Sequence, residues 1–587
     1  MMSICKVISD LSIAEPKSAI SSNAKQGCWR TTNYQCGEIV GKMVYTDSSL
    51  MHPSHNGYSL KPSSLTVPIL RLKLNVAGWH RVIVGIWGDV EGRKYGASGQ
   101  RMKLSGDRSY VPLVRQTPVE GSTLALETIE EVVFTHADLT NQDLMIAPPF
   151  PNSDTVTAVA YVKLESLSEA EIREIKKDRN SSSTRKLISY NDGLSFFGRK
   201  EYWEKEDIWE MIEPYRYSDV KTLVWGLVGD RTIFPTKAGE MVEGPGSEKF
   251  YSLKDRGINP LVTALEYAHE MGLEFYVYQR MGAWLDTFPH EIWSSKFTLN
   301  HPEFRCVSKD GKLLTRMSYA YPEVRQRQID LLAEVAAYGV DGIDLNFMRG
   351  PVFTFYEDVL VEGFKKEFGE DPRVLDEWDE RWLKYRRWPM TKFVKDLRVK
   401  LDEVGKNLGK RIAISAITFP TALGNLYYGL DIETWVKEGL VDRLVPWGNV
   451  RGMPPADLDY YIKLTKGTST TIWPHLFVFI DKTYMAKPGH DYKQDALDHY
   501  DKGAEGLAMW DLVGFDALNK TGPSLRRLGH IDEMREDVKN GGMYETPIYQ
   551  KLQQLGDADM SVFSAPTENR DRLIPNYYPK HMVMWPS

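Results

Sequence analysis

Apolar runs of strand length alternate with helical segments from residue 187 to residue 515, and this rhythm constrains the fold more than any other feature. Runs such as LISYND and KTLVWGLVGD have the length of buried strands. Helical segments between them begin at Pro and end at Gly, as in PEVRQRQIDLLAEVAAYG, which matches the residue preferences of helix ends. Such alternation predicts a parallel sheet whose strands are connected by helices.

Two architectures satisfy this pattern, a doubly wound open sheet and a closed (β/α)₈ barrel. The chain has eight strand signals, and a polar residue ends nearly every one of them, which favours the barrel. No GxGxxG or GxxxxGK[ST] motif follows the first strand, which argues against the usual nucleotide-binding sheet. We therefore predict an α/β fold with a (β/α)₈ barrel.

The chain before the barrel has a different period. Between residues 65 and 168, segments such as LRLKLNV alternate apolar and polar side chains, which is typical of antiparallel strands with one buried face. A β-sandwich fits this pattern. The predicted division is a polar lead-in at 1–55, a β-sandwich accessory domain at 56–185, a barrel at 186–540 and a C-terminal extension at 541–587.

Composition excludes some partners and favours others. The 587 residues carry 73 basic and 80 acidic side chains, a net charge of −7, so nothing indicates a nucleic-acid partner. The 16 Trp and 30 Tyr fit flat, amphipathic ligands such as sugars, although aromatic residues also fill cores. The sequence does not indicate an oligomeric state.

The sequence shows neither a signal peptide nor a membrane-spanning segment. The first residues lack the apolar region of a signal peptide, and no run reaches the roughly 18 apolar residues of a membrane span. We therefore expect a cytoplasmic protein without a membrane partner, an expectation that a misassigned start would change. The 4 cysteines form no CxxC pair and are expected as free thiols, with a Cys28–Cys36 bridge as the alternative.

Polar residues at the strand ends are the candidates for chemistry, because barrel enzymes place their sites at the carboxyl ends of the strands. A single acid there is more often a turn former or a helix cap, so the set matters more than any member. The predicted substrate-binding residues are Asp192, Asp230, Gln279, Arg280, Asn346, Arg349, Trp447, His475 and Trp510.

Three acids are the predicted catalytic residues, namely Asp344, Glu357 and Asp511. Glycoside hydrolysis needs one carboxyl group to protonate the leaving oxygen and a second to attack or to activate water, while Trp faces stack on the sugar. Glu357 has an ordinary alternative, the first turn of a helix, where an acid is favourable. The alternative for Asp344 is a salt bridge to Arg349.

No metal or cofactor is expected. The sequence has no HExxH, and no HxH follows the first strand of the barrel. A GxSxG nucleophile elbow is also missing, which argues against the common serine hydrolases.

The segment GVDGIDLNFMRGP, together with YPEVR and NHPEFRCVSKDGK upstream, resembles the barrel of the glycosyl-hydrolase-like family 10, bacterial proteins regarded as glycosidases. The fourth strand of that family typically reads VDGIHLDYIRYP. The resemblance implies a TIM barrel that acts on a carbohydrate substrate. One departure matters: Asn346 stands where the family has its presumed catalytic Asp, and Asp344 stands where it has His.

This departure leaves two interpretations open. Asp344 has taken over the carboxylate role from the same face of the strand, or the site uses Glu357 or Asp511 or does not hydrolyse at all. A carbohydrate-binding protein on a degenerate barrel is therefore the first alternative function. A sugar lyase or isomerase that acts through His475 or Tyr278 is the second, and product analysis would distinguish it.

Overall fold

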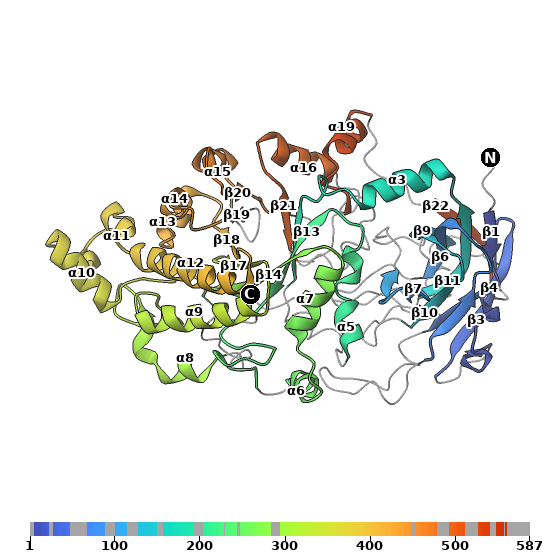
Figure 1. Ribbon diagram of the computed structural model, residues 1–587, viewed down its shortest axis with the longest axis horizontal. Helices are drawn as coiled ribbons and strands as arrows, with labels where there is room; N and C mark the ends of the chain where they lie inside the picture. Colours follow the sequence, from blue (N-terminus) through green and yellow to red (C-terminus); the bar gives the residue numbers. More distant parts are fainter. Residues whose placement is uncertain are drawn as a thin grey trace, which may run out of the picture.

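The computed structural model of the chain describes residues 5–22, 27–46, 67–88, 100–113, 127–148, 157–191, 204–227, 229–243, 247–282, 284, 294–448, 453–477, 492–510, 526–540, 548–556 and 558–559. Figure 1 shows two parts side by side, an all-β part built mainly from the N-terminal residues and an α/β part that follows it.

The β part contains two sheets, antiparallel except for the short pairing of β2 with β3. The larger sheet is formed by β1 (Cys5–Ile8), β2 (Ile20–Ser21), β3 (Trp29–Cys36), β4 (Ile39–Thr46), β6 (Trp79–Gly88), β9 (Thr128–Asp138), β11 (Thr157–Ser166), β22 (Ile548–Leu555) and β23 (Ala558–Asp559). The smaller sheet is formed by β5 (Leu70–Lys73), β7 (Gln100–Leu104), β8 (Val111–Leu113) and β10 (Asp143–Ala147). Leu72, Leu144 and Val84 belong to one buried cluster, so the two sheets share a core.

Strand β22 links the two ends of the larger sheet. Its residues 548–551 pair with β9, and its residues 552–555 pair with β3. Strands β3, β4, β11, β6, β9 and β22 therefore form a hydrogen-bonded ring with its own core, which includes Tyr34, Tyr161 and Leu552. A simple sandwich lacks this ring. This sheet also includes segments that the sequence analysis placed outside the β-sandwich. They are the strands at 5–46, in the expected lead-in, and β22, in the expected extension.

The α/β part contains one sheet of eight parallel strands. They are β12 (Leu187–Asn191), β13 (Val220–Gly226), β14 (Glu274–Arg280), β17 (Gly342–Asn346), β18 (Ala413–Thr418), β19 (Arg443–Pro446), β20 (Thr471–Ile472) and β21 (Leu507–Trp510). The first seven are neighbours in chain order, and β21 pairs with β12. A parallel bridge between His475 and Ala508 joins the chain after β20 to β21.

Helices connect these strands. They are α5 (Lys205–Trp209), α6 (Glu248–Asp255), α7 (Pro260–Glu270), α8 (Lys296–Asn300), α9 (Pro322–Ala337), α10 (Asp358–Phe368), α11 (Glu380–Tyr385), α12 (Trp388–Leu408), α13 (Ala422–Tyr427), α14 (Ile432–Lys437), α15 (Leu458–Thr465), α16 (Tyr492–Asp501) and α19 (Ile531–Lys539). A hairpin of β15 (Arg305–Val307) and β16 (Leu313–Met317) precedes α9, and α3 (Glu169–Arg179) leads from the β part into the sheet.

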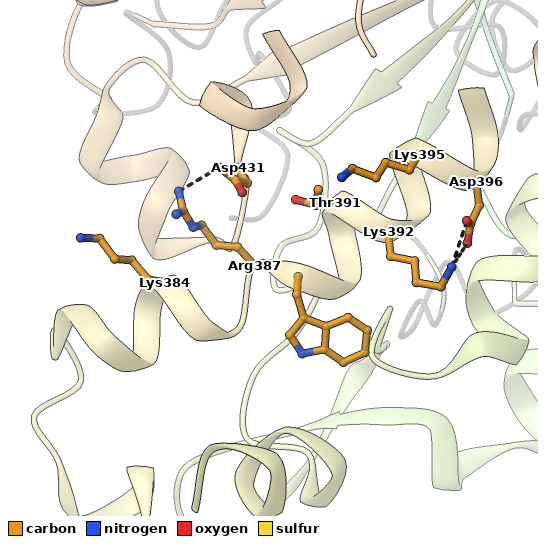
Figure 2. A pocket seen from close by; sticks show the side chains of 8 residues that line it. Lys384, Arg387, Thr391, Lys392, Lys395, Asp396 and Asp431 are labelled. Carbon is orange, nitrogen blue, oxygen red and sulfur yellow. Dashed lines mark hydrogen bonds and ion pairs between the residues drawn. The ribbon is translucent and has the colours of Figure 1, made fainter. Parts of the chain in front are cut away.

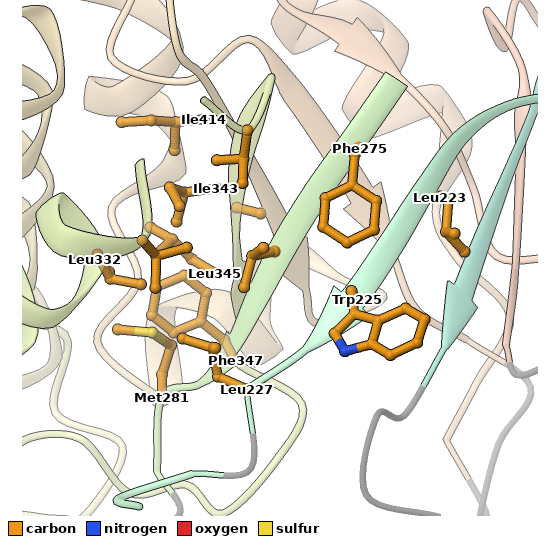
Figure 3. Close-up of a cluster of buried hydrophobic side chains, with 14 of the residues drawn as sticks. Leu223, Trp225, Leu227, Phe275, Met281, Leu332, Ile343, Leu345, Phe347 and Ile414 are labelled. Carbon is orange, nitrogen blue, oxygen red and sulfur yellow. The ribbon is translucent and has the colours of Figure 1, made fainter. Parts of the chain in front are cut away.

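The parallel strands have two buried faces. One face, with Trp225, Phe275 and Leu345, packs against the helices in the largest core of the molecule (Figure 3). The other face carries a separate cluster that includes Tyr190, Tyr278 and Trp447. Since neighbouring residues of a strand point to opposite faces, β12, β13, β14, β18, β19 and β21 each contribute to both clusters.

The predicted α/β fold is confirmed, since strands and helices alternate from β12 onward. The predicted domain boundaries and the closed barrel stay predictions. Cys5, Cys28, Cys36 and Cys306 are all free thiols, so the alternative bridge between Cys28 and Cys36 does not form.

Among the described residues, no helix combines the length and the apolar character needed to cross a membrane.

Candidate active site

Asp344 lies on the inner face of the parallel sheet. Its neighbours Ile343 and Leu345 belong to the helix-facing core, so the Asp344 side chain points the other way. It is fully buried there, at 0% exposure. Its Oδ2 accepts a hydrogen bond of 2.9 Å from the Tyr190 hydroxyl, whereas its Oδ1 makes no hydrogen bond to a described residue. The partner of Asp344 is thus Tyr190 rather than Arg349.

Aromatic rings surround this carboxyl group. We call Tyr190, Tyr278, Trp447, His475 and Trp510 the aromatic cluster. The rings of Tyr190 and Trp510 stack with centroids 5.5 Å apart, and the rings of Trp447 and His475 stack at 3.6 Å. Trp510 is only half-buried, so the cluster reaches the surface at the carboxyl ends of the strands. Such a wall can hold the apolar face of a ligand ring.

The cluster changes the protonation behaviour of its polar members. Burial raises the pKa of Asp344 to about 6, although the nearby hydroxyls of Ser415 and Tyr190 and the charge of Arg443 oppose the rise. Burial also lowers the pKa of His475 to about 3, so its imidazole is neutral at physiological pH. Asp344 is therefore a carboxyl group that can gain or lose a proton near neutrality, the property of a general acid or base.

Comparison of the sequence with known families gives one match. Residues 197–452 match the family glycosyl hydrolase-like 10. This match confirms the resemblance seen in the sequence. It contains Asp344 and Trp447, whereas Tyr190, His475 and Trp510 lie outside it.

The chain is also similar to solved structures of glycosidases. They include alpha-L-fucosidase isoenzyme 2 from Paenibacillus thiaminolyticus (14% identity, 62% of this chain and 50% of that chain, TM-score 0.41). The catalytic domain of beta-amylase from Paenibacillus polymyxa is a second (9% identity, 60% of this chain and 99% of that chain, TM-score 0.42). An alpha-galactosidase from Thermus thermophilus is a third (10% identity, 88% and 95%, TM-score 0.31).

The alignment with the fucosidase spans half of that enzyme's length. No protein with a curated description matches the chain.

Asn346, like Asp344, is a position at which the sequence analysis expects this chain to depart from the family pattern. It is buried at the end of β17, and its Oδ1 accepts a hydrogen bond of 3.0 Å from the Met348 backbone NH. Arg349 follows in the same loop, with its guanidinium 6.0 Å from the centre of the Trp510 ring. Asn346 and Arg349 therefore lie at the rim of the aromatic cluster, close to Asp344.

Glu357 has no partner in common with Asp344. It occupies the N-cap position of α10, and both of its carboxylate oxygens accept the Phe355 backbone NH, at 3.0 and 2.8 Å. Burial raises its pKa, while Phe355, Cys306 and Ser318 favour the charged form. Glu357 therefore precedes the first turn of α10, but its carboxylate binds the loop before the helix and makes no cap hydrogen bond to it.

The other predicted residues lie in different surroundings. Gln279 shares the helix-facing side of β14 with Phe275, and its side-chain NH₂ donates to the Gly229 carbonyl at 2.8 Å. Asp230 accepts hydrogen bonds from Ser295 and Thr298 and pairs with Arg327 at 3.2 Å, which makes it a structural acid. Arg280 ends β14 next to Asn346 in the strand register. Asp192 and Asp511 lie outside the described residues.

Two residues of the inner face were missed by the analysis of the sequence. Tyr190 holds Asp344, and the only signal was its position beside Asn191 in the first strand. Arg443 lies deeper, where it donates to Glu274 at 2.6 Å and to Thr222 at 2.7 Å and stacks over Tyr276. This network fills the amino-terminal end of the inner face.

A pocket of about 400 Å³ lies elsewhere, on α11 and α12 (Figure 2). It is lined by basic side chains, but these are paired: Arg387 with Asp431 at 3.1 Å, Lys392 with Asp396 at 3.0 Å. It contains no residue of the aromatic cluster. Within the described ranges, no group of three or more His, Cys, Asp or Glu side chains is placed to hold a metal ion.

Proposed function

We propose that the protein is a glycoside hydrolase of the (β/α)₈ barrel type, and that Asp344 is one of its two catalytic carboxyl groups. The observation that carries this proposal is the buried Asp344, with a pKa of about 6, inside a wall of aromatic rings at the carboxyl ends of the strands. The match to glycosyl hydrolase-like 10 over residues 197–452 supports the same reaction class.

Hydrolysis by this site divides the work between two carboxyl groups. Asp344 exchanges a proton or attacks the anomeric carbon, and the rings of Trp447 and Trp510 hold the sugar face. Asn346 and Arg349 bind hydroxyl groups at the rim. We assign the second carboxyl group to Asp511, a prediction from the sequence because it directly follows Trp510 at the end of β21. Glu357 ranks below both, since both of its carboxylate oxygens already accept the Phe355 backbone NH in the loop before α10.

The alternative functions find less support. A lyase or isomerase needs a base, but the pKa of about 3 makes His475 a weak one. Burial and Asp344 together raise the pKa of Tyr190 far above its usual value, so its phenolate does not form near neutrality. A carbohydrate-binding protein without activity does not need a carboxyl group with a pKa near neutrality. Asn346, in place of the family's acid, is the observation that favours this alternative.

The test compares the wild type with Asp344→Asn on a panel of gluco-, galacto-, xylo- and fuco-configured nitrophenyl glycosides and oligosaccharides. We expect new reducing ends from the wild type and a rate about 100- to 10,000-fold lower in the variant, as for loss of an acid–base group. Asn has the same shape and still accepts a hydrogen bond from Tyr190, so the fold is preserved; circular dichroism checks this. A variant as active as the wild type would exclude Asp344 from catalysis.

A further inference from the structure

Four aromatic side chains form a row that leads from the end of β18 to the surface. We call Phe419, Tyr428, Tyr427 and Trp378 the aromatic row. The ring centroids of Phe419 and Tyr428 are 4.3 Å apart, those of Tyr428 and Tyr427 are 5.0 Å apart, and those of Tyr427 and Trp378 are 4.6 Å apart. Exposure increases along the row, from 6% at Phe419 to 54% at Trp378.

The row begins directly after β18, the strand next to β17 in the sheet. Phe419 follows the last residue of β18, Thr418, whose carbonyl accepts a hydrogen bond of 3.0 Å from the Trp447 backbone NH. Trp447 belongs to the aromatic cluster around Asp344. The remaining rings come from α13, directly after β18, and from the segment before α11, within the connection after β17. Both connections leave the carboxyl ends of their strands.

The row is held in place by buried polar contacts. Arg386, with 1% exposure, donates to the Tyr427 carbonyl, and its guanidinium lies 5.4 Å from the centre of the Tyr427 ring. The Tyr427 hydroxyl donates to Glu377, the residue before Trp378. These contacts fix the outer half of the row before any ligand arrives, which lowers the entropy cost of binding.

Charged residues that follow Trp378 in the chain are engaged in ion pairs, which favours a neutral ligand. Acids and bases near it pair with one another: Arg381 with Asp379 at 2.7 Å and Glu370 at 3.2 Å, and Lys384 with Glu380 at 2.5 Å. A charged ligand would have to break these pairs. A protein partner would favour a contiguous apolar patch, whereas the residues next to Trp378 in the chain, Glu377 and Asp379, are charged.

We propose that the aromatic row binds the remote units of a neutral oligo- or polysaccharide whose reacting bond lies at Asp344. The proposal rests on the proposed glycosidase function and adds the substrate class, a glycan longer than a disaccharide. Pyranose rings present apolar faces to the rings and hydroxyl groups to the flanking polar residues. Binding of remote units can then be used to position the reacting bond.

The experiment uses Asp344→Asn as the parent, so that no substrate is consumed. Calorimetry measures the affinity for cello-, malto-, xylo- and chito-oligosaccharides of two and six units. We expect a hexasaccharide of one series to bind more tightly than its disaccharide. Adding Trp378→Ala should weaken hexasaccharide binding by about 3- to 10-fold, the loss of one aromatic contact. Trp388→Ala is the matched control, because Trp388 is also partly exposed (39%) but lines the basic pocket.

Three results would overturn the proposal: hexasaccharides that bind no better than disaccharides, Trp378→Ala with unchanged affinity, or an equal loss in Trp388→Ala. A concentration-dependent dimer that Trp378→Ala dissociates, without an effect on glycans, would assign the row to a second copy of the chain instead. A third kind of result separates the two proposals. If binding depends on glycan length and on Trp378 but the wild type hydrolyses nothing, glycan binding by the aromatic row is supported and only the proposed function is rejected.

Discussion

At the scale of single residues, Asp344 lowers the stability of the folded chain while it serves the proposed reaction. A carboxyl group with a pKa of about 6 in the folded chain loses its proton less readily than in the unfolded chain. Above that pH the folded state therefore holds a buried negative charge at a cost in free energy. Such a residue is retained where its chemistry is used, because an apolar side chain would stabilise the same position better.

The hydroxyl of Tyr190 sets part of this pKa. Because it donates to the ionised carboxylate, its removal in Tyr190→Phe should raise the pKa of Asp344 by roughly 1 to 2 units, the value of a hydrogen bond to a charged group. The limb near pH 6 in the pH profile of kcat/KM should move to higher pH by that amount. Tyr276→Phe is the control, since Tyr276 stacks under Arg443 and does not contact Asp344. A limb that stays in place would show that Tyr190 does not tune the acid.

At the scale of secondary-structure elements, β22 is the member that completes the ring of the β part. Half of its side chains are exposed, and Leu552, with 1% exposure, is its buried residue beside Tyr34 and Cys36. Together with the partly buried Leu555, it brings apolar surface from a distant part of the sequence into the core of the ring.

Leu552→Ala should lower the free energy of unfolding of the β part by about 2–5 kcal/mol, since it leaves a cavity in the ring. The measurement is urea denaturation followed by circular dichroism. Ile548→Ala in the same strand should cost less than about 0.5 kcal/mol, because Ile548 is 56% exposed. Equal effects of the two substitutions would mean that β22 contributes no core.

Features with a local sequence pattern could be predicted, whereas contacts between residues far apart in the chain could not. Strands β13, β14, β17 and β18 were predictable because each is a continuous apolar run bounded by turn residues. Strand β22 reads IYQKLQQL, too polar to predict, and its partner β3 lies more than 500 residues away in the chain. Asp344 was predictable as a polar residue in an apolar strand. Its contact with Tyr190 was not, because tyrosine also fills cores and 154 residues separate the two.

At the scale of the whole molecule, charged contacts join the β part to the α/β part. Arg101 of β7 donates to both carboxylate oxygens of Glu210, at 2.7 and 2.8 Å, and Arg179 stacks 3.7 Å from the centre of the Tyr217 ring. His530 lies between Asp219 at 2.8 Å and Asp178 at 2.7 Å, so one imidazole bridges α3 and the parallel sheet.

The bridge at His530 makes stability depend on pH. Burial alone would lower the pKa of His530, but Asp219 and Asp178 raise it above the usual value despite the charge of Arg527. A raised pKa adds stability that is complete below the unfolded pKa of about 6.5 and is lost as the pH rises through the folded value. His530→Gln should therefore lower the Tm by about 1–3 °C at pH 5.5 and by less at pH 9.

Differential scanning fluorimetry from pH 5 to pH 9 measures this difference. The control is His301→Gln, since His301 forms an ion pair with one acid, Glu303, at a more exposed position. A Tm difference that does not change with pH would contradict a charged bridge at His530.

The ring of the β part has a consequence for the order of events during synthesis. Five of its strands have left the ribosome by residue 166, but β22 follows about 400 residues later. At roughly 5–20 residues per second, that interval lasts tens of seconds. Throughout it, β9 and residues 34–36 of β3 lack the partner that β22 later supplies, and the α/β part is made meanwhile. Five strands of the ring are thus translated before the α/β part, and the ring closes only after it. Until then its open edges are free to pair with another nascent chain.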